Sequence, residues 1–182
     1  ELERLRQAWR AGRSAGRVVA RRVEHAKAAL ARPPRFPPEG GQHNQWYQCE
    51  RCQAPLETVD DTHHRCPRCR TMYSGYPYDS VIYARQHAAL TADIEACAWA
   101  YALTGGTRFA EHAREALVGY GERYSAYPHH SASQGKRTDP DSPSGAHVFE
   151  QTLNEAAWMQ SLATAYDLIR LSAVLSPQDH TT

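Results

Sequence analysis

The sequence has no apolar run that approaches the roughly 20 residues a helix needs to cross a bilayer. It also lacks a stretch that combines a basic start, an apolar middle and a small-residue cleavage site, as a signal peptide would. We therefore expect no membrane span. The chain opens on Glu1 instead of Met, which is consistent with removal of a targeting segment or of a longer N-terminal part, so the compartment stays open.

Net charge is nearly absent, at +1 over 182 residues, but the charges are unevenly distributed. Residues 1–32 carry nine Arg or Lys against three Glu, which leaves the rest of the chain acidic. Such a stretch can contact nucleic acid or another anion. Its apolar residues recur at alternating spacings of three and four, which favours a basic amphipathic helix that packs on a partner. The stripe consists of Leu2, Leu5, Trp9, Gly12, Gly16, Val19, Val23, Ala26 and Leu30.

Proline and glycine cluster in a few short segments, and these divide the chain into three parts. The segment 33–41 carries four prolines and two glycines, which cannot continue a helix because proline lacks the backbone donor and glycine costs conformational entropy. We therefore expect an N-terminal basic amphipathic helix over 1–32, a linker and cysteine module over 33–80 with a turn-rich end, and a helical region over 81–182.

Two helices at the start of the helical region are predicted to form a tight antiparallel hairpin. The first spans about 81–103 and ends at the glycines that follow Thr104, where glycine can adopt a left-handed C-cap. The second begins at Thr107, a predicted N-cap, and ends ahead of Pro128.

The last long helix is expected over about 146–172, and apolar residues surround most of its circumference, which predicts that it is buried. Near its end, Tyr166 and Asp167 are expected to form a hydrogen-bonded pair and not a catalytic unit. Ser176 and the proline after it then have the pattern of an N-cap and a first helical position. Because this helix start is followed so soon by the chain end, we expect the chain to be a piece of a longer protein.

Residues 128–145 are predicted to form a long loop, and loops of this length are more often functional or mobile than merely connecting. Several polar and cationic residues in or beside the loop are expected to be exposed, where they can face an anionic chain. They are Tyr127, His129, His130, Lys136 and Arg137.

The cysteines Cys49, Cys52, Cys66 and Cys69 form two C-x2-C pairs with 13 residues between the pairs. A two-residue gap lets both thiolates of a pair reach one ion at about 2.3 Å, and two such pairs complete a tetrahedron. Zinc suits four thiolates and has no redox chemistry. Four protein ligands leave no open position, so the predicted zinc site is structural.

Other interpretations of the cysteines stay open. Two disulfides can form in an exported chain, and a rubredoxin-like iron site uses similar pairs. Two cysteines separated by two residues close a disulfide badly, which favours the metal. His63 and His64 are alternative ligands that we expect to face solvent instead, and Cys97, on an apolar helical stripe, is expected to be a buried thiol.

Ribbon-like cysteine modules often bind nucleic acid. In this chain the segment 53–61 between the pairs ends in two aspartates and lacks the interleaved basic and aromatic residues of a phosphate-binding surface. We therefore do not expect nucleic acid as the partner of this module, and interpret it as a clip that holds the linker against the helices. A non-enzymatic module that binds nucleic acid or a protein is the alternative function.

From about Trp46 onward the sequence resembles the N-terminal helical region of the heparinase II/III-like polysaccharide lyases. The resemblance rests on the segment 98–106 with its Ala-Trp-Ala-Tyr-Ala-Leu-Thr-Gly-Gly motif, on Gln-Thr-Leu-Asn-Glu-Ala-Ala-Trp at 151–158, and on Ala-Tyr-Asp-Leu-Ile at 165–169. The aromatic residues on either side of the cysteines resemble members that carry a ribbon-like insert. The resemblance implies a mainly α fold: part of an incomplete α/α toroid, with a small zinc-ribbon insert, in a longer α+β protein.

The resemblance also implies β-elimination on an acidic, uronic-acid-containing polysaccharide. In the family the catalytic helix and tyrosine lie further along than the matched residues, so we expect this chain to be inactive without the remainder of the lyase. By analogy the lyase would be periplasmic or secreted. Residues expected to contribute to substrate binding are Gln151, Asn154, Glu155, Trp158, His129 and His130. The alternative is that Gln151 and Glu155 satisfy loop backbone and Trp158 packs in the core.

Overall fold

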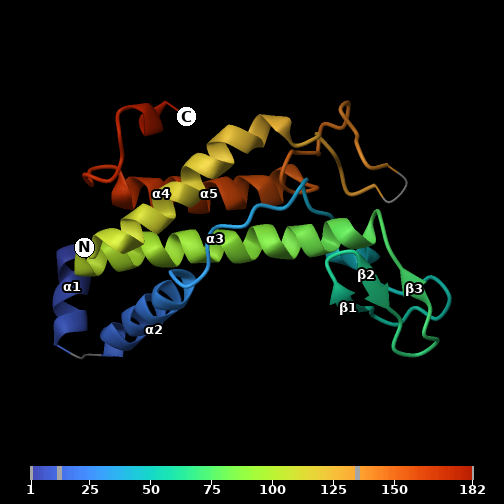
Figure 1. Cartoon of the computed structure of the whole chain (residues 1–182), viewed down its shortest axis with the longest axis horizontal. Helices are drawn as coiled ribbons and strands as arrows, with labels where there is room; N and C mark the ends of the chain where they lie inside the picture. Colours follow the sequence, from blue (N-terminus) through green and yellow to red (C-terminus); the bar gives the residue numbers. More distant parts are fainter. Residues whose placement is uncertain (1, 12–13, 134–135, 182) are drawn as a thin grey trace. The chain divides into compact units, whose positions relative to one another are not determined.

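The computed structural model describes residues 2–11, 14–133 and 136–181, and Figure 1 follows the chain through its elements. The described residues are mainly helical with a small three-stranded sheet, which confirms the predicted helical class. The helices are α1 (Leu2–Arg10), α2 (Ser14–Ala29), α3 (Tyr78–Thr104), α4 (Thr107–Arg123) and α5 (Thr152–Ile169). The strands are β1 (Glu57–Asp60), β2 (His63–Arg65) and β3 (Met72–Tyr73).

The chain forms two compact units. The first unit comprises Glu1–Phe36, Ala89–Glu122 and Trp158–Thr182, and the second comprises Pro37–Ala88 and Arg123–Ala157. Each of the helices α3, α4 and α5 contributes one part to each unit.

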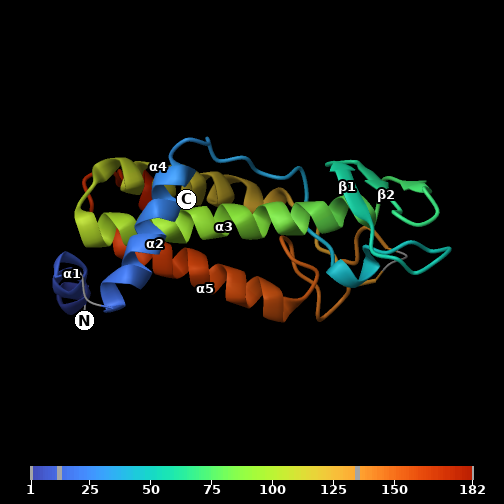
Figure 2. The same cartoon turned by 90° about the horizontal axis from the view of Figure 1, so that it is seen from below.

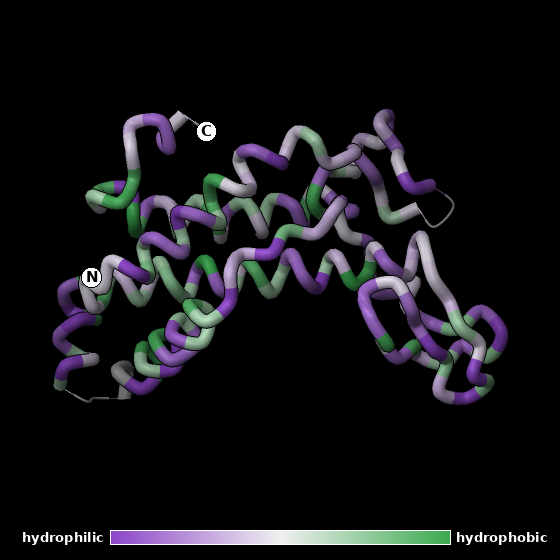
Figure 3. The backbone as a smooth tube through the Cα atoms, in the orientation of Figure 1, coloured by the Kyte–Doolittle hydropathy of each residue, from purple (hydrophilic) through white to green (hydrophobic). Residues whose placement is uncertain are grey.

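In the first unit, the single helix that we predicted over 1–32 is two helices, α1 and α2. The predicted apolar stripe of this helix includes Gly12, which lies outside the described residues. The sequence has two glycines, Gly12 and Gly16, near the boundary between α1 and α2, and glycine lowers helix stability by about 1 kcal/mol relative to alanine. The stripe itself is confirmed in α2, where Val19, Val23 and Ala26 are buried. Hydrophobic and hydrophilic segments alternate along this helix in Figure 3.

The boundary between α3 and α4 matches the predicted glycine cap. Gly105 has a φ of +77°, and its backbone N–H donates to the carbonyl of Tyr101 at 2.7 Å. This left-handed conformation suits glycine because it has no Cβ. Figures 1 and 2 both show α4 turning back over the end of α3, as expected for a hairpin. On the inner side of α4, the ring of Phe36 rests where Gly119 has no side chain.

Helix α5 is shorter and less buried than predicted. It begins at Thr152, because the backbone N–H groups of residues 147–149 donate to the side chain of Glu155 and not to helical carbonyls. One seam of α5 is buried, whereas Leu153 is 77 % and Met159 47 % exposed. The expectation that this helix is buried on most sides is therefore wrong.

Beyond α5 the N-cap is Pro177 and not the predicted Ser176, so the helix starts one residue later than expected. The 3-10 helix η3 (Gln178–His180) follows Pro177, and Oδ2 of Asp179 accepts hydrogen bonds from the backbone N–H and the hydroxyl of Ser176. The predicted pair of Tyr166 with Asp167 is wrong: Tyr166 Oη hydrogen-bonds to His180, and Asp167 pairs with Arg170.

The second unit joins the linker, the sheet and the first turns of α3. The backbone N–H groups of Gly41 and Gln42 donate to the carbonyls of Val148 and Ser80, which fixes the linker in an extended conformation. The strands pair in the order β1-β2-β3, all antiparallel, and lie beside the first turns of α3 in Figure 2. Tyr73 of β3 packs against a core that also involves the first turns of α3, made of Tyr47, Cys49, Ala54, Leu56, Cys66, Tyr78, Val81 and Ile82.

Candidate metal centre

Two similar turns position the four cysteines. In the first turn the N–H of Gln53 donates to the carbonyl of Cys49, and in the second the N–H of Arg70 donates to the carbonyl of Cys66. Gln53 and Arg70 each follow directly after the second cysteine of a pair, and both have a left-handed φ, of 55° and 63°. Because non-glycine residues rarely adopt this conformation, its appearance at both equivalent positions indicates that the two turns have the same tight geometry.

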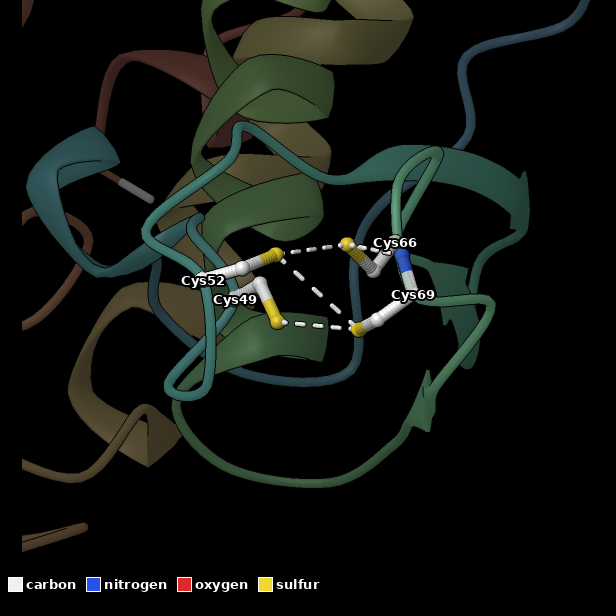
Figure 4. Close-up of side chains that lie close together, drawn as sticks. All are labelled: Cys49, Cys52, Cys66 and Cys69. Carbon is white, nitrogen blue, oxygen red and sulfur yellow. Dashed lines mark hydrogen bonds between the residues drawn. The ribbon is translucent and has the colours of Figure 1, made fainter.

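The four sulfur atoms converge on one point, as Figure 4 shows. All four Sγ atoms lie within 4.8 Å of one another. Cys49 Sγ is 3.6 Å from Cys69 Sγ, and Cys52 Sγ is 3.4 Å from Cys66 Sγ and 3.9 Å from Cys69 Sγ. Four thiolates bound at about 2.3 Å to a tetrahedral ion lie about 3.8 Å apart. The cluster therefore has the dimensions of a tetrahedral metal site.

The same distances exclude the disulfide alternative for this conformation. A disulfide requires a sulfur–sulfur distance of about 2.05 Å, and all five cysteines are free. The pairs that approach most closely join one turn to the other, so the sulfurs face one another across the centre and not within a pair.

Hydrogen-bond donors around the sulfurs favour the thiolate form at two positions. The hydroxyl of Tyr73 lies 3.1 Å from Cys49 Sγ and lowers the pKa of that thiol to about 6. The hydroxyl of Thr71, 3.2 Å from Cys69 Sγ, likewise lowers the pKa of Cys69. At Cys52 a hydrogen bond with Cys66 raises the pKa of the thiol to about 12, because the bond favours the protonated form of Cys52. A divalent cation at the centre would oppose this effect, since a metal deprotonates its thiol ligands.

The cluster lies at the edge of the core of the second unit. Cys49 and Cys66 are buried, Cys52 is half-buried and Cys69 is exposed. The buried pair packs with Tyr78 and Val81 from the first turn of α3. A metal held here joins two surface turns to that helix, which is the arrangement expected of a clip.

The histidines beside the cysteines behave differently from each other. His63 is exposed, as predicted, and contacts Asp60. His64 was predicted to face solvent but is completely buried: its Nδ1 lies 2.8 Å from the hydroxyl of Tyr47 and its Nε2 3.0 Å from Asp79. Strand alternation explains the difference, because β2 turns successive side chains to opposite faces. Cys97 is a buried thiol, as expected, and burial raises its pKa to about 12.

The four residues in or just before α5 that were expected to bind a substrate are not gathered on one exposed face. Gln151 precedes the helix, and its carbonyl accepts from the N–H of Glu155. The Glu155 side chain is buried and accepts backbone N–H groups, while Trp158 is buried with its ring edge-on to Tyr120. Of the four, Asn154 alone is exposed, and it donates to Glu150. The alternative of structural roles for Glu155 and Trp158 agrees with these contacts.

The residues in and beside the long loop are more buried, and make more hydrogen bonds and ion pairs, than predicted. The expectation of exposure is wrong for Tyr127, whose hydroxyl donates to the carbonyl of Pro37, and for His130, whose Nε2 lies 2.6 Å from the carbonyl oxygen of Gly41. Arg137 is exposed but is paired with Glu39. His129 is half-buried. The linker supplies these partners, so the sequence of the loop alone carries no signal for them.

The sequence analysis did not identify three residues that make polar contacts in the second unit: Tyr73, Thr71 and Gln42. Tyr73 and Thr71 contact sulfur atoms of the cluster, and their position shortly after Cys69 in the sequence was the available signal. The buried amide of Gln42 donates to the hydroxyl of Tyr76 and to the carbonyl of Ser131. No local pattern around Gln42 predicts this contact, because its partners are 34 and 89 residues away.

Comparison with known proteins does not identify the chain: no protein-family model matches it, and no curated protein has a matching sequence. Among the described residues, no helix combines the length and the apolar character that crossing a membrane requires, as the sequence predicted.

Proposed function

We propose that Cys49, Cys52, Cys66 and Cys69 bind one zinc ion that stabilises the second unit. The observation that carries this proposal is the convergence of four sulfur atoms at tetrahedral spacing, from two turns of equal geometry. Zinc is preferred to iron because it is the usual occupant of a closed four-thiolate site that has no redox role. Four protein ligands leave no position for a reacting water, so the role is structural.

Metal analysis of the purified chain tests this proposal. We expect one zinc per chain, released together with four thiols only after a chelator is added under denaturing conditions. Cys66→Ser should lose the metal and most of the stability of the second unit, whereas Cys97→Ala should keep the metal, since Cys97 lies outside the cluster. Absence of metal from a chain whose four thiols are free would overturn the proposal, and iron in place of zinc would overturn the choice of metal.

We further propose that the chain is the N-terminal helical part of a polysaccharide lyase that acts on uronic-acid polymers. The support is the resemblance of segments 98–106, 151–158 and 165–169 to the heparinase II/III-like lyases, together with the mainly helical architecture. The α/α toroid and the zinc-ribbon character of the cysteine module belong to this proposal. The contacts of Glu155 and Trp158 assign them to the scaffold of such a protein, and leave Asn154 as the accessible candidate for sugar contact.

Binding and cleavage measurements test the lyase proposal. A panel of uronic-acid polysaccharides and one neutral polysaccharide would be assayed for binding to the chain and for the ultraviolet absorbance of unsaturated uronate products. We expect binding to one acidic polymer and no cleavage, because the catalytic residues of the family have no counterpart in the matched segments. Two outcomes would contradict the proposal: the chain binds the neutral polysaccharide as tightly as the acidic ones, or it binds no polysaccharide of the panel.

One observation favours the alternative function, contact with a nucleic acid. Arg17, Arg21 and Arg22 of α2 are exposed, and none of them has an ion pair with the residues that the structure describes. A duplex bound there would dissociate steeply as salt is raised, since each neutralised phosphate releases a counterion. If the chain binds a nucleic-acid duplex and the double variant Arg17→Gln, Arg21→Gln binds it more weakly, this alternative would be established in place of the lyase.

A further inference from the structure

The four cysteines of the cluster differ in their access to solvent. Cys69 is exposed, Cys52 is half-buried, and Cys49 and Cys66 are buried. Cys69 belongs to the loop between β2 and β3, whereas Cys49 and Cys66 are part of the core of the second unit. The susceptibility of a cysteine to oxidation follows its accessibility. A small oxidant in solution therefore reaches Cys69 before the other three.

The sulfur of Cys69 has a second sulfur close to it, from the other turn. Cys49 Sγ lies 3.6 Å from Cys69 Sγ, and Cys52 Sγ lies 3.9 Å from it (Figure 4). A disulfide bond is about 2.05 Å long, so Cys49 and Cys69 can bond once their sulfurs approach by about 1.5 Å. Rotation of the Cys69 side chain can supply this movement, because that side chain is exposed.

We propose that the cysteine cluster is a redox switch, in which a peroxide converts Cys69 and Cys49 into a disulfide and thereby releases the metal. This inference rests on the proposed zinc site and adds the order in which its ligands react. In the first step the Cys69 sulfur attacks one oxygen of hydrogen peroxide and the O–O bond breaks. The leaving hydroxide takes up a proton and becomes water, and Cys69 becomes a sulfenic acid.

Cys49 completes the reaction as the resolving cysteine. Its sulfur attacks the sulfur of Cys69, the S–O bond breaks, and the leaving hydroxide is protonated to a second water. The two sulfurs have then lost two electrons, which the peroxide has gained, and the metal keeps its charge. Only Cys52 and Cys66 remain as ligands. Because a closed structural site requires four ligands, the metal dissociates.

Peroxide treatment of the zinc-loaded chain tests the switch. The zinc content of the untreated chain is measured first, and a chromophoric chelator then follows the zinc that hydrogen peroxide releases. We expect one zinc for each disulfide formed. Peptide mapping by mass spectrometry should find Cys49 joined to Cys69, with Cys97 still a free thiol because it is buried outside the cluster.

Histidine is the informative substitution, because three cysteines and one histidine also form a closed zinc site. Cys69→His therefore keeps four ligands and removes the exposed thiolate. Cys52→His is the matched control, since it makes the same change at the half-buried cysteine and leaves Cys49 and Cys69 in place. Cys69→His should lose the release of zinc by peroxide, and Cys52→His should retain it.

A chain that holds no zinc before treatment overturns the zinc site and the switch together. In a chain that holds zinc, three results overturn the switch alone. They are zinc that stays bound in peroxide, a first disulfide that joins any pair other than Cys49 and Cys69, and release from Cys69→His as fast as from the wild type. If Cys69→His binds no zinc, the disulfide mapped in the wild-type chain decides.

Discussion

Oε2 of Glu155 lies 2.8 Å from the backbone nitrogen of Phe149, and the same carboxylate also accepts the N–H groups of His147 and Val148. One buried side chain thus satisfies three consecutive backbone donors just ahead of α5. Buried donors without a partner cost free energy, so this carboxylate determines where the irregular segment ends and the helix begins.

Glu155→Gln should destabilise the chain by about 2 kcal/mol. The amide keeps one acceptor oxygen, but its NH2 group would face backbone donors that it cannot satisfy, and hydrogen bonds to a charged acceptor are the stronger kind. Glu111→Gln makes the same chemical change at an exposed position of α4 and should change stability by less than about 0.5 kcal/mol. Denaturant unfolding of both variants measures the difference, and equal effects would contradict the role given to Glu155.

Asp179→Asn should release the segment after α5. Arg114 donates through Nε and Nη2 to both oxygens of Asp179, at 2.8 and 2.7 Å, and this guanidinium holds the pKa of Asp179 well below its usual range. We expect a lower free energy of unfolding, because hydrogen bonds between charged groups are the stronger kind. Asp167→Asn is the control, since Asp167 pairs with Arg170 on the exposed surface, where such pairs contribute little. Hydrogen exchange of residues 176–181 should rise in the first variant and not in the second.

Stability should fall as the pH is lowered from about 6.5 to about 4, in part because of His87. Burial lowers the pKa of His87 to about 4 from an ordinary value of 6.5, so the unfolded chain binds a proton in this range and the folded chain does not. At 1.36 kcal/mol per pKa unit, the contribution is roughly 3 kcal/mol.

His87→Gln tests this dependence because the glutamine amide can still donate to the carbonyl of Glu39, which His87 Nε2 contacts at 3.0 Å. Zinc ligands also take up protons in acid, so the informative quantity is the difference in slope between the variant and the wild type. His180→Gln, at an exposed histidine, should leave the slope unchanged. A wild-type slope in His87→Gln would show that another group is responsible.

Gly119→Ala should destabilise α4 even though alanine is the better helix former. An added Cβ would lie 2.2 Å from Cζ of Phe36, so the ring, which also packs edge-on against Tyr120, would have to move. We expect a net loss of about 1 to 3 kcal/mol, as for other overpacked sites. Gly121→Ala in the same helix is exposed and should stabilise by up to about 1 kcal/mol. Thermal unfolding that shows the same sign for both would contradict the contact.

Tyr73→Phe should weaken zinc binding at the cysteines by about tenfold or more. The Tyr73 hydroxyl lies 3.1 Å from Cys49 Sγ and accepts the N–H of Glu50, and partners of metal ligands typically contribute 10- to 100-fold in affinity. Competition with a chromophoric chelator measures the change. Tyr166→Phe, which removes a hydroxyl that bonds to His180, should have no effect on zinc. If zinc affinity is equal in both variants, Tyr73 does not support the site.

The sequence alone determined the features that depend on local spacing. Two C-x2-C pairs specify four converging sulfurs because each pair sits on a single turn, and Gly105 specifies a helix end because its left-handed φ excludes most other residues. The helical class and the burial of one stripe of α2 follow from periodicity in the same way.

Only the tertiary structure decided which polar groups are buried and with what partners. The sequence predicts that His64 and His130 are exposed. Both are buried, because groups distant in the sequence provide hydrogen-bond partners for their imidazole nitrogens. Glu155 shortens α5 for the same reason, since a carboxylate competes with helical carbonyls for backbone donors once the fold brings them together. The contact of His129 with His147 likewise has no sequence signature, because the two residues are 18 positions apart in the sequence and their rings meet only in the folded unit.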